Sequence, residues 1–325
     1  MKMKGLAFAA GVLLTALAGA AASAQEFPEK PVTILVNYGA GGGVDMTARS
    51  VQRFLPEALG QPVQVENYPG AGGKIGLIKF MEAPRDGYTI LTAFAPATTY
   101  VRSQDPSIFE NDDLAIINMQ WSDEVVLVAS KDTGWNNLND MIEAVRAEPG
   151  KFSFASSGPG SAGPIMAKML FEALDLDVKI VPYAGGGKTR AAIKGGHVHM
   201  TAGGNSGMVP VSDSTNILGV FWDKPVPEWP GSMTVNEQIA DTGVELPTAA
   251  AFRFHAVHRE VKENYPERFE ALVEAFRKTT LENEAFKEFA DGASIRREWN
   301  GPEASQAMID EVDARFFDIL QAATQ

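Results

Sequence analysis

Four times along this chain, an apolar run typical of a β-strand leads into a cluster of glycines and then into a segment with helical spacing of apolar residues. The four units occupy about residues 32–60, 61–82, 152–174 and 178–196. Strands that alternate with helices predict an α/β fold with mostly parallel sheets flanked by helices. Two groups of units, separated by a polar stretch at 102–113, indicate two lobes. Glycine loops after parallel strands lie where open sheets bind ligands.

Other periodic segments complete the predicted fold. Apolar runs predict strands at 88–94, parallel to the first two, and at 125–130, about 198–204 and 216–222. One helix is predicted at 138–148. The last third of the chain is predicted to be mainly helical, with helices at 265–279, 282–291 and 302–321.

Residues 1–24 have the pattern of a secretory signal peptide. Two lysines precede an uncharged apolar stretch at 5–22, and the small-residue pattern at 22–24 predicts cleavage before Gln25. A membrane anchor is the alternative, because about 18 apolar residues can just span a bilayer. The Ala-rich composition and the cleavage pattern favour the signal peptide. We therefore expect an exported, soluble protein, and the chain has no cysteine to carry a lipid or form a disulfide.

The net charge of the chain argues against partners that carry many negative charges. Without the two lysines of the signal peptide, the 28 basic residues become 26 against 41 acidic ones, a net charge of about −15. Such a surface repels nucleic acid and anionic membranes. A small anion instead responds to local dipoles, and a helix N-terminus carries unsatisfied N–H groups and about half a positive charge. Each glycine loop is therefore a candidate anion site, although tight turns also use glycine for geometry alone.

Nucleotide-binding motifs match two of the loops only in part. The sequence GAGGGV at 39–44 has Val44 where a dinucleotide fingerprint needs Gly or Ala, and Glu66 lies 27 residues beyond its first glycine rather than about 20. The sequence PYAGGGKT at 182–189 has Pro182 where a P-loop begins with glycine. An exported protein also has no access to a cytosolic cofactor. We therefore expect no cofactor.

Catalytic and metal-binding patterns are weak. The four histidines form two pairs, His197 with His199 and His255 with His258, without the cysteines or the HExxH pattern of a zinc site. We expect them to be exposed histidines at strand ends. The sequence GNSGM at 204–208 lacks the final glycine of a nucleophile elbow. No residue is indicated as a nucleophile, so we expect a binding protein rather than an enzyme, and no metal site.

Five motifs together resemble a known family. In chain order they are PEKPVTILVNYGAGGGVDMTAR, LGQPVQVENYPGAGGKIG, DGYTIL, EPGKFSFASSGPGS and IVPYAGG. They are similar to the Bug-type periplasmic solute receptors of tripartite tricarboxylate transporter systems. The resemblance extends from Phe27 to about Gly196 and is looser beyond. The family usually has an Asp after the fourth strand, at about Gly203 here, and the stretch 225–262 is unfamiliar.

The resemblance implies a fold and a role. The fold is the two-lobe type II periplasmic-binding-protein fold, with lobe 1 expected at 25–126 and 255–325 and lobe 2 at 127–254. The cleft between the lobes would close on a small organic anion, either a di- or tricarboxylate or an aromatic acid. The receptor would deliver this anion to the membrane subunits of its transporter, and we expect a monomer.

The same motifs imply site residues. In such receptors a carboxylate is held between two loops of the first lobe, mainly by backbone amides and bridging waters, and the facing lobe adds two loops. For the first lobe the expected residues are Tyr38, Ala40, Gly41, Gly42, Gly43, Val44, Asp45, Gly72, Gly73 and Lys74. For the second lobe they are Ser156, Ser157, Gly158, Ser161, Tyr183, Gly185 and Gly186. Further candidates, for the part of the pocket that sets specificity, are Phe94, Ala95, Trp121 and Asn205.

Charged residues near the loops have more than one expected role. Asp45 cannot hold an anion with its own carboxylate, so we expect it to cap the first helix or to order the loop. Arg49, one turn on, either pairs with Asp45 or faces solvent. Lys74 and Lys188 either set the charge preference of the site or point into water. Two alternative functions stay open at this point: an exported enzyme acting on a carboxylic acid, and a sensor that presents its ligand to a signalling partner.

Overall fold

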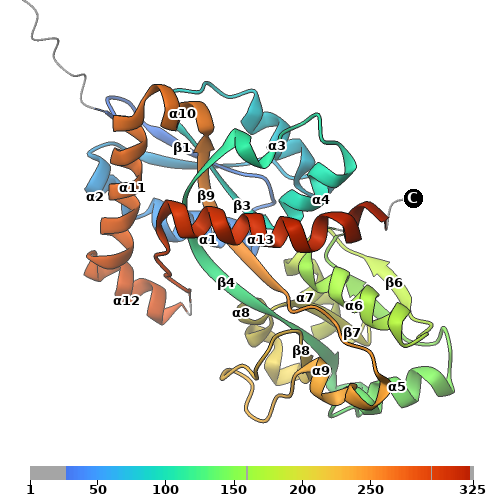
Figure 1. Ribbon diagram of the computed structural model, residues 1–325. Helices are drawn as coiled ribbons and strands as arrows, with labels where there is room; N and C mark the ends of the chain where they lie inside the picture. Colours follow the sequence, from blue (N-terminus) through green and yellow to red (C-terminus); the bar gives the residue numbers. More distant parts are fainter. Residues whose placement is uncertain (1–26, 159, 294, 323–325) are drawn as a thin grey trace, which may run out of the picture.

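The computed structural model describes residues 27–158, 160–293 and 295–322 (Figure 1). The predicted signal peptide, residues 1–24, lies outside this range. Within the described part of the chain, no helix is both long enough and apolar enough to cross a bilayer.

The strands of the described residues hydrogen-bond to one another in the order β2-β1-β3-β9-β4-β7-β5-β6, with β8 also paired to β4. Their bounds are β1 (Val32–Val36), β2 (Val63–Asn67), β3 (Thr89–Ala95), β4 (Leu114–Ser130), β5 (Ser153–Ser156), β6 (Lys179–Pro182), β7 (Met200–Gly204), β8 (Thr215–Val220) and β9 (Ala250–His258).

Helices connect and cover these strands. Their bounds are α1 (Gly43–Gln52), α2 (Leu55–Leu59), α3 (Lys74–Met81), α4 (Ala97–Gln104), α5 (Leu138–Ala147), α6 (Ala162–Ala173), α7 (Gly186–Lys194), α8 (Asn205–Met208), α9 (Val235–Gln238), α10 (Arg259–Asn264), α11 (Pro266–Leu281), α12 (Glu284–Gly292) and α13 (Gly301–Ala322). The four predicted strand, glycine loop and helix units are all present, as β1 with α1, β2 with α3, β5 with α6 and β6 with α7.

The long strand β4 is shared by two sheets. Its residues Leu114 to Glu124 pair with β9, and its residues from Val125 onward pair with β7 and β8. We call the part formed by β2, β1, β3, β9 and the first half of β4 sheet A, and the part formed by the second half of β4 with β8, β7, β5 and β6 sheet B. Figure 1 shows β4 running from the upper group of elements to the lower one. The predicted lobe boundaries, at 126 and 254, fall inside β4 and β9, and that division stays a prediction.

Parallel pairing within each sheet follows the sequence prediction. β1 is parallel to β2 and β3, and β5 is parallel to β6 and β7. The antiparallel pairs all involve β4 or β9. Sequence analysis recognised only the second half of β4 and missed β9, which it placed in a mainly helical region. Polar residues at buried positions of both strands, such as Asn118, Gln120 and Arg253, interrupt the apolar pattern.

Burial along the strands explains which ones lie inside. The central strands β1 and β3 are buried along almost their whole length, as expected where helices cover both faces of a sheet. In the edge strand β2 only Val63 is buried, and exposed residues alternate with partly exposed ones along the rest of the strand; β6 at the other end is mostly exposed. Alternate residues of β1 and β3 therefore belong to two separate apolar clusters, one on each face of the sheet.

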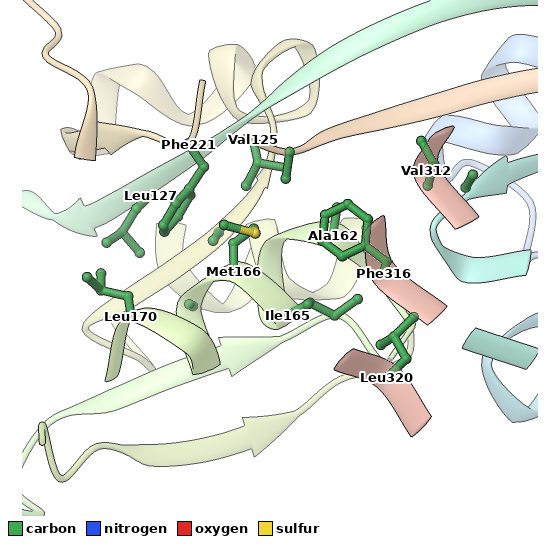
Figure 2. Close-up of a cluster of buried hydrophobic side chains, with 14 of the residues drawn as sticks. Val125, Leu127, Ala162, Ile165, Met166, Leu170, Phe221, Val312, Phe316 and Leu320 are labelled. Carbon is green, nitrogen blue, oxygen red and sulfur yellow. The ribbon is translucent and has the colours of Figure 1, made fainter. Parts of the chain in front are cut away.

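Helix α13 links the two sheets. It contacts β4 and α4, and its residues Val312, Phe316 and Leu320 are buried in the same apolar cluster as Ala162 and Ile165 of α6. Figure 2 shows these side chains from α13 and α6 next to one another. Burying a large apolar side chain stabilises the fold by about 1.5–3 kcal/mol. The C-terminal helix therefore holds the elements of sheet B against those of sheet A.

Two histidines are buried, contrary to the expectation that all four are exposed at strand ends. His255 has no exposed surface, and its ring nitrogens lie 2.8 Å from the Thr92 hydroxyl and 2.7 Å from the Gln120 side-chain oxygen. Since that amide oxygen only accepts, the network fits a neutral ring. His258 stacks on Phe80 with 4.2 Å between ring centroids. Both histidines belong to β9, the strand that sequence analysis missed.

This burial predicts a pH dependence of stability. Desolvation lowers the pKa of His255 to about 3, so the unfolded chain takes up a proton near pH 6.5 that the folded protein does not. The contribution of the neutral ring is complete above pH 6.5 and is lost as the pH falls toward 3, by at most about 1.4 kcal/mol per pH unit. We expect the gap in unfolding free energy between wild type and His255→Gln to narrow from pH 7 to pH 4 in urea titrations. A gap that stays constant would contradict this assignment.

Candidate functional site

One cavity of about 990 Å³ lies between the glycine loops of sheet A and those of sheet B. From the sheet A side, it is lined by the loops at 38–44 and 69–73. From the sheet B side, it is lined by the loop before α6 and by residues 182–191 at the start of α7. The structure therefore brings the four glycine loops, which are up to about 150 residues apart in the sequence, to one place.

Four helices point their N-termini into this cavity. They are α1, α3, α6 and α7, whose N-cap residues are Gly42, Gly73, Ser161 and Gly185. At none of these four N-caps does a side chain accept a hydrogen bond from a backbone N–H of the helix. By contrast, the N-cap side chains of α5, α9 and α12, which lie outside the cavity, each accept such a bond. The first N–H groups of a helix have no partner within the helix. The cavity thus collects N–H donors and the positive ends of four helix dipoles.

Asp45 orders the first loop from behind. Its carboxylate accepts the Gly41 N–H at 2.8 Å, the Arg49 side chain at 2.9 Å and the Asn67 amide at 2.9 Å. Although burial works to raise the pKa of Asp45, these donors hold that pKa below its ordinary value. The expected pairing with Arg49 is confirmed. Of the two roles expected for Asp45, the structure shows loop ordering, because Gly42 occupies the N-cap position.

The second loop is tied to the first by Tyr38. Its hydroxyl donates to the Gly72 carbonyl at 2.6 Å. Gly73 has a φ of 98°, and a Cβ there would lie 2.7 Å from the Asn37 side chain, so only glycine fits this close approach. The two loops therefore form one rigid edge of the cavity.

Arg253 of β9 contributes a buried guanidinium to the cavity wall. It forms an ion pair with Asp123 at 2.8 Å, and its Cζ lies 4.3 Å from the centre of the Trp121 ring. A Cβ on Gly43 would lie 2.9 Å from its Nη2, which places the guanidinium against the first turn of α1. Its Nη1 is buried without a hydrogen-bond partner among the described residues. A buried donor of this kind favours an anionic partner.

Arg190 of α7 brings a second guanidinium to the cavity. It is half-buried, and within the described chain it forms no ion pair and no hydrogen bond. Burial, and to a lesser extent repulsion from Arg253, lower the pKa of Arg190. The charged residues that line the cavity are Lys188, Arg190 and Arg253, and the lining includes no Asp or Glu among the residues that the structure describes.

Most of the expected site residues line the cavity. These are Tyr38, Ala40, Gly41, Gly42, Gly43, Val44, Gly72, Gly73, Phe94, Ser157, Gly158, Ser161, Tyr183, Gly185 and Gly186, together with Trp121. Whether they contact a ligand stays a prediction.

Five expected residues do not line the cavity. Asp45 supports its loop from behind, and Lys74 forms an ion pair with Asp105 at 2.9 Å. Ala95 is fully buried, and Ser156 is buried beneath the loop that it precedes. Asn205 is buried and holds Glu228 and the Trp229 indole, each at 2.8 Å. Each of these side chains is buried or bonded to a partner of the surrounding chain, so it does not line the cavity.

Sequence reasoning missed both arginines. Arg253 is a charged residue within the apolar run AAFRFHAV, and such a residue in a buried strand needs a partner or a ligand. Arg190 follows Gly186 by four residues, which is one helical turn, so its guanidinium can reach back to the loop. As for metals, the described residues contain no group of three or more histidine, cysteine or acidic side chains that could hold an ion.

Comparison with known proteins identifies the fold and the family. In structure the chain is similar to the periplasmic binding protein BugD, at a TM-score of 0.76, with 24% identity and coverage of 92% of this chain and 99% of that one. It is also similar to MatC from Rhodopseudomonas palustris with bound malate, at 0.76, with 20% identity and coverage of 90% and 100%. A third structure, R. palustris Rpa4515 with adipate, gives 0.76 at 20% identity, covering 92% and 98%. The fold is the type II periplasmic-binding-protein fold.

Sequence relatives agree with the structural ones. BugT of Bordetella pertussis is 33% identical over 203 residues, which cover 61% of this chain and 62% of BugT. A UPF0065 protein of the same species is 32% identical over 182 residues, which cover 55% of each chain. The chain thus spans somewhat more than half the length of these two relatives.

The family model of the tripartite tricarboxylate transporter receptors, TctC, matches residues 47–312, which is more than half of the chain. This is a family of receptors and not of enzymes, which confirms the expectation of a binding protein. The chain belongs to the tripartite tricarboxylate transporter receptor family.

Proposed function

We propose that this protein is a periplasmic receptor that binds a small organic carboxylate between its glycine loops and delivers it to a tripartite membrane transporter. The observation that carries this proposal is the lining of the cavity. Four helix N-termini and three cationic side chains face it, and no acidic side chain of the described residues does. This lining contrasts with a whole chain that has 41 acidic and 28 basic residues.

The lining suits a carboxylate better than a neutral solute. A carboxylate accepts several N–H bonds at once, and hydrogen bonds to charged groups contribute about 1.5–3 kcal/mol each. The N-terminus of α1 and the guanidinium of Arg253 lie together beside Gly43, where an added Cβ would lie 2.9 Å from Nη2, so one carboxylate can accept from both. Phe94 and Trp121 provide apolar and aromatic surface for the rest of a ligand.

The ligands of the related structures support a carboxylate as the chemical class of the ligand. Adipate and malate, which are bound in two of them, are both dicarboxylates. The cavity volume of about 990 Å³ lies at the upper end of the usual range for small-molecule sites, about 300–1,000 Å³. A small dicarboxylate fits such a cavity.

Compartment, domain organisation and assembly form part of the same proposal. Residues 1–24 would direct export and be cleaved. Lobe 1, at 25–126 and 255–325, and lobe 2, at 127–254, would move about the shared strands β4 and β9 and close on the ligand. The receptor would act as a monomer and bind the membrane subunits in its closed form.

Calorimetric titration with succinate, malate, adipate, citrate and benzoate tests the proposed function. We expect at least one of these anions to bind and to raise the melting temperature, because ligand at 100 times its Kd adds about 2.7 kcal/mol of stability. The neutral amides of the same acids, in which every carboxyl group is amidated, are the control and should not bind. No binding by any of the anions would contradict the proposal.

Substitution of Gly42 by Val tests the position of the carboxylate. Gly42 has a φ of −82°, so valine can adopt this backbone without strain, and its Cβ would lie no closer than 3.4 Å to the Gly39 carbonyl oxygen. The valine methyl groups would cover the N–H groups of α1. We expect anion affinity to fall about tenfold or more with the melting temperature nearly unchanged.

The matched control is Gly292→Val in α12, where an added Cβ meets no atom within 4 Å. This variant should bind as the wild type does. Normal binding by Gly42→Val would place the carboxylate elsewhere.

A further inference from the structure

Arg190 occupies an electrostatically unfavourable position. Its guanidinium folds back over the start of its own helix, because a Cβ on Gly186 would lie 3.4 Å from its Nη1. The same atom lies 3.4 Å from the Cβ position of Gly207, at α8. The first turn of α7 contains no acidic residue. A cation at the positive end of a helix dipole is destabilised, by about as much as an anion there would be stabilised.

Arg253 adds to this excess of positive charge from the sheet A side. It carries a counter-charge in Asp123, but that carboxylate also accepts the N–H of Ser206 at 2.8 Å and its hydroxyl at 2.7 Å. The Asp123 carboxylate is therefore shared between Arg253 and the start of α8. Among the described residues, Arg190 has no acidic partner of its own. Repulsion between the two guanidinium groups contributes to the lowered pKa of Arg190.

A single carboxylate beside Gly43 would satisfy Arg253 and leave Arg190 without a partner. The two guanidinium groups come from opposite sides of the cavity. That of Arg253, on β9 of sheet A, lies beside the first turn of α1, and that of Arg190, on α7 beside sheet B, lies at the start of α7 and next to α8. A ligand with an acidic group at each end can neutralise both and can also accept from the first N–H groups of α7. Each guanidinium group then forms an ion pair with one end of the ligand, and these two attractions offset the repulsion between the two groups in the ligand-free site.

We propose that Arg190 is the specificity-determining residue that binds a second acidic group, so that this receptor selects dianions over monoanions of the same length. This inference rests on the proposed carboxylate-binding function. It assigns the first carboxylate to α1 and Arg253, and the second acidic group to α7 and Arg190.

The test compares succinate, malate, glutarate and adipate with their monoamides, which keep the length but remove one charge. Calorimetric titrations are made on the wild type, on Arg190→Gln and on Lys194→Gln. Lys194 is the matched control, because it loses the same charge from the same helix but is exposed in the last turn of α7 and does not line the cavity. The melting temperature of each ligand-free variant is also measured.

We expect the wild type to bind its preferred dianion about 10- to 100-fold more tightly than the monoamide. Arg190→Gln should lose most of this ratio while its monoamide affinity stays within about threefold of wild type, and Lys194→Gln should keep the ratio. Ligand-free Arg190→Gln should melt at or above the temperature of the wild type, because the substitution removes an unbalanced cation. A structural role for Arg190 would instead lower it.

Three results would overturn the inference while leaving the proposed function intact. They are equal affinity of the wild type for dianion and monoamide, an unchanged ratio in Arg190→Gln, and equal losses in Arg190→Gln and Lys194→Gln. If the wild type binds none of these anions, the proposed function itself fails and this inference fails with it.

Discussion

The buried carboxylate of Asp123 is the point through which the two sheets and the cavity are connected. It lies on β4 just before that strand passes from sheet A to sheet B, and it binds Arg253 of β9 and the start of α8 at Ser206. A Cβ on Gly204 would lie 2.1 Å from this carboxylate, so the chain needs glycine there. Removing one partner of a buried ion pair costs about 3–5 kcal/mol. The pairing with Asp123 therefore fixes the position of the Arg253 guanidinium in the cavity wall.

Charge is separated around the cavity. The chain is strongly acidic as a whole, yet the described residues that line the cavity include no acid, and the buried carboxylates of Asp45 and Asp123 each accept from several donors of the surrounding chain. These carboxylates organise the donors without presenting negative charge to the cavity. The dipoles of four helices then act at short range, where the distant surface acids are screened by salt within about 10 Å.

Much of the fold and of the site could be predicted from local pattern. The glycine loops, the helices that follow them and the parallel strands were recognisable, because each is encoded within about 25 consecutive residues. The limits appear where a residue depends on distant partners. β9 was missed, because Arg253 and His255 are unfavourable in a buried strand unless they have polar partners. Their partners, Asp123, Gln120 and Thr92, are brought beside them only by the fold. Lys74 was expected at the site, but Asp105 holds its side chain elsewhere.

The sequence by itself determined that glycine loops join strands to helices at the ends of four strands, because glycine content and strand-to-helix order are local properties. Only the tertiary structure decided that the cavity shared by these loops is completed by two arginines, one on β9 of sheet A and one on α7 beside sheet B. The physical reason is that an ion pair or a cavity wall depends on positions in space. Arg253 and Asp123 are 130 residues apart in the chain, and their attraction acts only after β4 and β9 have paired.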